Sequence, residues 1–113
     1  MPELNNFGAV FTHAIQLENG AHDFFATQGD EEHAKAAKKR VSKLERARRE
    51  YVVEITLEPI TDLDSDAHML PTGEAATAET VTATLRGFYE AAAPKINVRQ
   101  AQRVLEKCAK GLS

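Results

Sequence analysis

The chain has 113 residues, of which 42% are hydrophobic and 27% are charged, a composition that suits one domain with a modest core. Its 14 basic and 17 acidic side chains give a net charge of -3, which is too even for a nucleic-acid-binding or anionic-membrane surface. The single cysteine, Cys108, excludes an internal disulfide framework and a thiolate zinc cluster. No secretory signal pattern opens the sequence, so we expect a reducing cytoplasm as the location.

Apolar residues recur at alternating steps of three and four, which predicts an all-helical chain. The first helix is expected over about residues 6–28, with Gly29 ending it. Asp30 is the expected cap of a second helix over about residues 31–57, which must end before Pro59. The very short turn between these helices predicts a helical hairpin.

A connection over residues 58–76 holds two prolines and three alternating aspartates. Those aspartates lack the glycine and glutamate that an EF-hand requires, so calcium binding of that kind is excluded. The third helix is expected over about residues 77–92 and the fourth over about residues 97–111, with Asn97 as its cap. We therefore predict a single all-α domain, a four-helix bundle of two antiparallel hairpins joined by a long crossover.

Glu18 is the most informative residue, because it lies inside the apolar stripe of the first predicted helix. A carboxylate in that place loses hydration on folding and needs a metal, a counter-charge or a proton. The inward seam of the second helix includes Leu44 and Arg48, so we expect Glu45 and Arg48 at the depth of Glu18. The basic run 35–40 is interpreted as a solvated helix face.

The pattern Ala-Ile-x-Leu-Glu-x-x-Ala-x-x-Phe-Phe around Glu18, followed one helix later by Leu-Glu-Arg around Glu45, resembles the ferritin-like superfamily, and its small rubrerythrin-type members most. The resemblance implies a bundle whose core holds two iron or manganese ions through glutamates and two Glu-x-x-His motifs. Hard carboxylates neutralise such metals, and an imidazole three residues on reaches the same ion.

Only part of that motif is present. Glu18, Glu45 and Glu106 stand at carboxylate positions, Thr82 replaces the fourth, and Arg48 and Ala109 stand where the histidines would be. The dimetal motif is thus incomplete, and the expectation is no cofactor, with iron or manganese as the alternative. An altered metal set would comprise Glu18, Glu45, Glu106 and His22, although a histidine on the flank of a helix more often only meets solvent.

Arg48 is a candidate source of the positive charge that metal ions would otherwise supply. A guanidinium is a permanent cation whose planar fork can bind carboxylates. One hypothesis is a buried ion-pair network of Arg48, Glu18 and Glu45. In the alternative, Arg48 extends out of the bundle along its aliphatic stem and Glu45 is ordinary surface.

The remaining reactive side chains point to structural roles. Cys108 falls on the inward face of the fourth helix, where a lone thiol usually packs. Tyr51 and Tyr89 occupy inward positions, where a hydrogen-bonded hydroxyl is expected. His13 and His33 fall off the inward seams and are expected at the surface.

Three functions follow, the first being a ferritin-like bundle with a degenerate dimetal site that acts as a non-catalytic binding or assembly module. We expect that module to be a homodimer with no nucleic-acid or membrane partner. The second is an atypical carboxylate-rich iron or manganese protein acting in oxidative stress or metal handling. The third is a generic helical protein-interaction domain. No arrangement of residues predicts a catalytic centre.

Overall fold

The computed structural model describes residues 7–51, 68–96 and 99–112, and in this part of the chain every regular element is helical. The four α-helices are α1 (Phe7–Thr27), α2 (Glu31–Tyr51), α3 (Ala78–Ala92) and α4 (Arg99–Lys110). Two short 3-10 helices, η3 (Gly73–Ala75) and η4 (Ala93–Lys95), flank α3. The prediction of an all-α four-helix bundle is confirmed.

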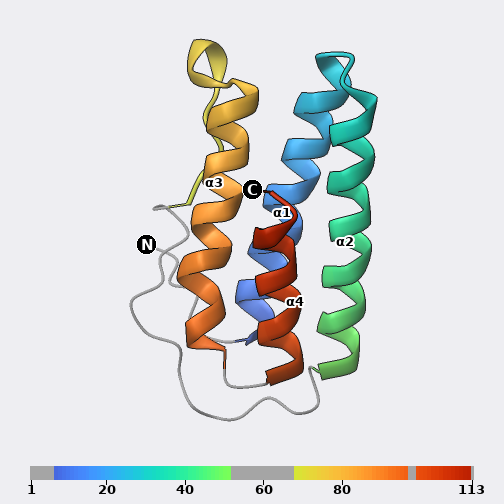
Figure 1. Ribbon diagram of the computed structural model, residues 1–113, viewed down its shortest axis with the longest axis vertical. Coiled ribbons are helices and arrows are strands. Elements are labelled where there is room, and N and C mark those ends of the chain that lie inside the picture. Colours follow the sequence, from blue (N-terminus) through green and yellow to red (C-terminus); the bar gives the residue numbers. More distant parts are fainter. Residues whose placement is uncertain (1–6, 52–67, 97–98, 113) are drawn as a thin grey trace.

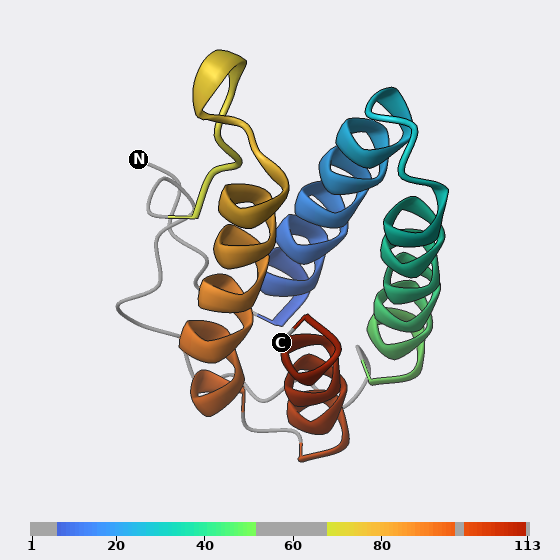
Figure 2. The same cartoon turned by 45° about the horizontal axis from the view of Figure 1, so that its top comes forward.

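The helices form two antiparallel pairs, α1 with α2 and α3 with α4 (Figure 1). α1 also packs on α3 and α2 on α4, so the four helices enclose one core. Figure 2 shows the same pairing from a tilted direction, with α4 shorter than the others and set beside α2. The predicted end of the second helix over residues 52–57, most of the 58–76 connection and the Asn97 cap lie outside the described residues.

The turn between α1 and α2 has the local chemistry that its sequence predicts. Gly29 adopts a φ of +76°, a left-handed conformation that favours glycine, and the Asp30 N–H donates to the Phe25 carbonyl at 2.9 Å. The Asp30 carboxylate accepts a hydrogen bond from the His33 backbone N–H at 3.1 Å and so caps α2. Because the turn is this short, α1 and α2 are held in a fixed register.

The second hairpin has its own boundary signals. Thr77 and Thr80 form a reciprocal capping box at the start of α3, and Pro94 follows the end of that helix within η4. Basic residues lie in the last turn of α4, where they complement the carbonyl end of the helix dipole.

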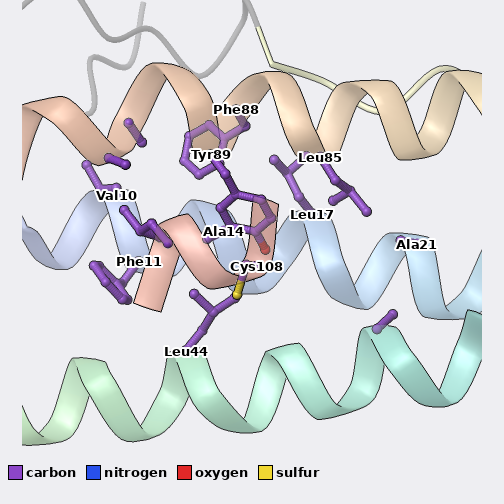
Figure 3. Close-up of a cluster of buried hydrophobic side chains, with 14 of the residues drawn as sticks. Val10, Phe11, Ala14, Leu17, Ala21, Leu44, Leu85, Phe88, Tyr89 and Cys108 are labelled. Carbon is purple, nitrogen blue, oxygen red and sulfur yellow. The ribbon is translucent and has the colours of Figure 1, made fainter. Parts of the chain in front are cut away.

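The core is built from small and aromatic side chains of all four helices. Figure 3 shows Val10 and Leu17 of α1 toward Leu85, Phe88 and Tyr89 of α3, with Phe11 of α1 on the side of α2, where Leu44 of α2 and Cys108 of α4 complete the cluster. The apolar stripe predicted for the first helix is confirmed from Val10 to Phe25, where Phe24 is half-buried and the other members are buried, namely Val10, Phe11, Ala14, Leu17, Ala21 and Phe25.

Two surface predictions are wrong. His13 is only 8% exposed, its Nε2 lies 2.9 Å from the His68 backbone oxygen, and its ring contacts Phe88. Arg40, expected on a solvated face, is only 9% exposed. His33 is exposed as predicted.

Candidate functional site

Glu18 is fully buried, with 0% of its surface exposed. It lies on α1 between Ala14 and Ala21, where that helix packs against both α2 and α3. The prediction that this carboxylate is removed from water is therefore confirmed. Its charge must be balanced inside the bundle, because an isolated buried carboxylate is strongly disfavoured.

The balancing cation is Arg40 of α2. Its Nε donates a hydrogen bond to Glu18 Oε2 at 2.6 Å, and the two groups form a buried ion pair. Charge-assisted hydrogen bonds of this length are among the strong ones in proteins. The chain thus supplies its own cation to Glu18, as predicted, but from a different arginine.

Tyr89 of α3 is the second donor to Glu18. Its hydroxyl donates to the same Oε2 atom, and the Tyr89 side chain is buried. The other oxygen, Oε1, has no hydrogen-bond partner among the described residues. One carboxylate oxygen therefore joins three helices: α1 carries it, α2 supplies a guanidinium and α3 supplies a phenol.

Burial in the core and the charges of this network raise the pKa values of Glu18, Tyr89 and Cys108. Burial raises the pKa of Glu18, while the Arg40 hydrogen bond and charge and the Tyr89 hydrogen bond oppose that rise. Burial, followed by the nearby Glu18 carboxylate, raises the pKa of Tyr89 well above its usual value. Burial and then Glu18 raise the pKa of Cys108 from 9.0 to about 11. Tyr89 and Cys108 therefore stay protonated at neutral pH, and Cys108 is the packed thiol that the sequence predicts.

The predicted network of Arg48, Glu18 and Glu45 is wrong in two of its three members. Arg48 and Glu45 are both exposed on the outer side of α2, where they line a shallow surface hollow with Ser42 and Arg49. Glu45 follows the buried Leu44 by one residue, which turns it about 100° away from the core. The alternative, in which Arg48 points outward, describes its placement.

The predicted metal set is not brought together either. Glu106 is exposed on α4, one residue beyond the buried Leu105, and it borders a hollow between α3 and α4. His22 is half-buried on α1, with its Nδ1 at 3.2 Å from Asp23 Oδ1. Of the four proposed ligands, only Glu18 lies in the core.

The residues present do not fit a dinuclear iron or manganese centre. Within the described ranges, no group of three or more His, Cys, Asp or Glu side chains could hold a metal ion. The only core carboxylate of the predicted set already has the Arg40 guanidinium on one oxygen, and a second cation beside it would be repelled. A single carboxylate, a phenol and a thiol with a pKa of about 11 are a poor donor set for these hard cations.

Arg40 could have been found from the register of the first hairpin. Glu18 and Arg40 each lie 11 residues from Gly29, one on either side of the turn. In an antiparallel pair joined by a tight turn, residues equally distant from the turn lie at the same height. Arg48 lies eight residues beyond Arg40, or about 12 Å farther along α2. The apolar periodicity alone did not distinguish the two arginines.

No helix in the described ranges combines the length and apolar character needed to cross a membrane. Comparisons with protein-family models, with curated proteins and with solved structures give no match.

Proposed function

We propose that this chain is a ferritin-like helical bundle that has exchanged a dimetal centre for an internal ion pair and acts as a non-catalytic assembly module. The observation that supports it is the single buried carboxylate, Glu18, whose Oε2 takes hydrogen bonds from Arg40 and Tyr89. In the ferritin-like pattern the residue at this position would bind metal. Here a guanidinium takes the electrostatic role of the ion.

A non-catalytic role agrees with the chemistry of the site. The Glu18 carboxylate has no exposed surface, and both Tyr89 and Cys108 have raised pKa values that keep them protonated. General acid–base or nucleophilic work requires a group that can reach a substrate and change its protonation state near neutral pH. The network is instead suited to fixing three helices relative to one another.

The module is proposed to work as a homodimer in a reducing cytoplasm. α2 presents a long row of exposed side chains along one edge of the bundle, which leaves a helix-length surface for a partner. The thiol of Cys108 is buried and unpaired, in keeping with a compartment where disulfides are not formed.

Metal analysis tests the proposal. Protein purified without chelator should carry no stoichiometric iron or manganese, and added Mn²⁺ should leave its thermal midpoint unchanged. The matched variants are Glu18→Gln, which alters the buried carboxylate, and Glu45→Gln, which alters an exposed one. One or two bound metal ions that are lost in Glu18→Gln but kept in Glu45→Gln would overturn the proposal and favour the iron or manganese protein.

A further inference from the structure

Basic residues are concentrated on two neighbouring helices. α2 holds eight of the 14 lysines and arginines of the chain, and α4 holds four. The two helices pack side by side (Figure 1), and all of these residues except Arg40 are exposed. The two helices therefore carry 12 basic against five acidic side chains, an excess that the near-neutral total charge of the chain conceals.

A groove of about 280 Å³ runs between α2 and α4 on this face. We define the basic groove by its lining residues, Lys43, Arg46, Ala47, Glu50, Val104 and Lys107. Arg46 donates to Glu50 at 2.8 Å, but the described residues offer Lys43 and Lys107 no carboxylate partner. The groove therefore carries a net positive charge above a small apolar floor of Ala47 and Val104.

The α1–α2 turn and the start of α3 lie at the same end of the bundle (Figures 1 and 2), and acidic residues gather there. We define the acidic end by six residues, Asp23, Asp30, Glu31, Glu32, Glu74 and Glu79. All are exposed except Asp30, which is half-buried as the cap of α2. Glu31 and Glu32 are exposed in the first turn of that helix.

The two surfaces cannot neutralise each other within one copy. Glu31 and Arg46 are 15 residues apart on one straight helix, which corresponds to about 22 Å. That distance exceeds the Debye length of about 8 Å at physiological ionic strength. Lys35 follows Glu31 by four residues on α2 and balances part of the charge of the acidic end, and the other exposed carboxylates of that end are available to a partner of opposite charge.

We propose that the basic groove of one copy binds the acidic end of a second copy. Both surfaces lie along the same helix, α2, so two copies placed antiparallel about a two-fold axis form the contact twice. The inference rests on the proposed function, since it names the contact that would hold the homodimer together. Nucleic acid is a weaker match, because Glu50 lies within the groove and its apolar floor offers nothing to a phosphate chain.

Charge reversal tests the contact in the full chain. Lys43→Glu combined with Lys107→Glu makes the groove acidic, and Glu31→Lys combined with Glu32→Lys makes the end basic. Each double variant should sediment as a monomer. An equimolar mixture of the two should form a dimer again, because both contacts then join opposite charges.

Sedimentation velocity supplies the measurement, with circular dichroism to show that each variant is folded. The wild-type dissociation constant should rise at least about tenfold between about 0.05 and 0.5 M salt, because exposed charges are screened. The control, Arg86→Glu with Lys95→Glu, reverses two charges that lie outside both α2 and the groove and should leave the dimer intact.

Three outcomes would overturn the inference. They are a wild type that stays monomeric at low salt, whether or not it binds labelled duplex DNA, a groove variant that still dimerises, and a mixture that remains monomeric. A dimer that survives the groove substitutions refutes this contact but leaves the proposed assembly module standing. If the dimer dissociates when the groove charges are reversed but the protein holds tightly bound metal, the contact stands and the proposed function is refuted.

Discussion

Replacing Arg40 by methionine should be among the most damaging substitutions in the described part of the chain. The change removes the cation that lies 2.6 Å from Glu18 Oε2 and leaves a fully buried carboxylate with only the Tyr89 hydroxyl as a donor. Breaking one side of a buried ion pair costs about 3 to 5 kcal/mol. For a domain of this size that loss lowers the thermal midpoint by on the order of 10 °C or more.

The pH dependence of this variant follows from the same carboxylate. Burial already raises the pKa of Glu18, and without Arg40 the folded-state pKa rises further. A group whose folded-state pKa is raised gives stability that is complete below its unfolded pKa and is lost as the pH increases. Arg40→Met should therefore lose up to about 1.4 kcal/mol per pH unit above the unfolded pKa of Glu18, near 4.5.

Urea unfolding followed by circular dichroism at pH 5 and pH 7.5 measures both effects. Arg48→Met is the matched control, because Arg48 is an exposed arginine on the same helix and should cost less than about 0.5 kcal/mol. The double variant Glu18→Met with Arg40→Met should recover most of the wild-type stability, since apolar replacement of a whole buried pair is often neutral. Equal losses for Arg40→Met and Arg48→Met, or a pH-independent loss for Arg40→Met, would refute the reasoning.

Three further predictions concern side chains around the same core. Tyr89→Phe removes a buried donor to Glu18 and should lower the free energy of unfolding by about 1 to 3 kcal/mol in the same urea assay; an unchanged midpoint would contradict this. Because the pKa of Cys108 is raised from 9.0 to about 11, stability should fall as the pH rises through this range, and Cys108→Ala should reduce the fall by up to about 2.7 kcal/mol. If the free energy of unfolding falls equally with pH in the wild type and in Cys108→Ala, Cys108 does not cause the loss of stability at alkaline pH. A β-carbon at Gly20 would lie 2.6 Å from Leu70 Cδ1, the end of a flexible side chain, while alanine in a helix interior is favoured over glycine by about 1 kcal/mol, so Gly20→Ala should leave the thermal midpoint nearly unchanged. In a Leu70→Ala background the same change should stabilise the chain by about 1 kcal/mol, and an equal effect of Gly20→Ala in both backgrounds would argue against the contact.

The helices and the buried carboxylate could be predicted from the sequence because their signals are local. Gly29 and Asp30 mark the first turn through backbone conformation and capping, and both act within a few residues of their own position. Glu18 is found because it interrupts an apolar stripe of one helix. Such features depend only on residues within one or two helical turns.

The residues of other helices that contact a buried side chain could not be predicted from hydrophobic periodicity alone. On α2, Arg40 and Arg48 lie four residues before and after the buried Leu44, at equal angles to either side of it. Only the height set by the Gly29 turn and the position of the neighbouring helices decide which arginine faces inward. His13 was misplaced for a similar reason, because its partner is the backbone of His68, 55 residues away.

The geometry of the ion pair suggests why a costly polar group occupies the core. A buried ion pair adds little stability over well-packed apolar residues, so we expect Glu18 and Arg40 to contribute more to specificity than to stability. Apolar helix faces tolerate sliding and rotation, whereas Glu18 Oε2 is satisfied only when α2 and α3 both present their donors to α1. A shift of α2 by one turn, about 5.4 Å, would remove Arg40 from the carboxylate and leave two buried charges unpaired. The network therefore penalises neighbouring registers of the bundle and fixes the height of α2 relative to α1 and α3.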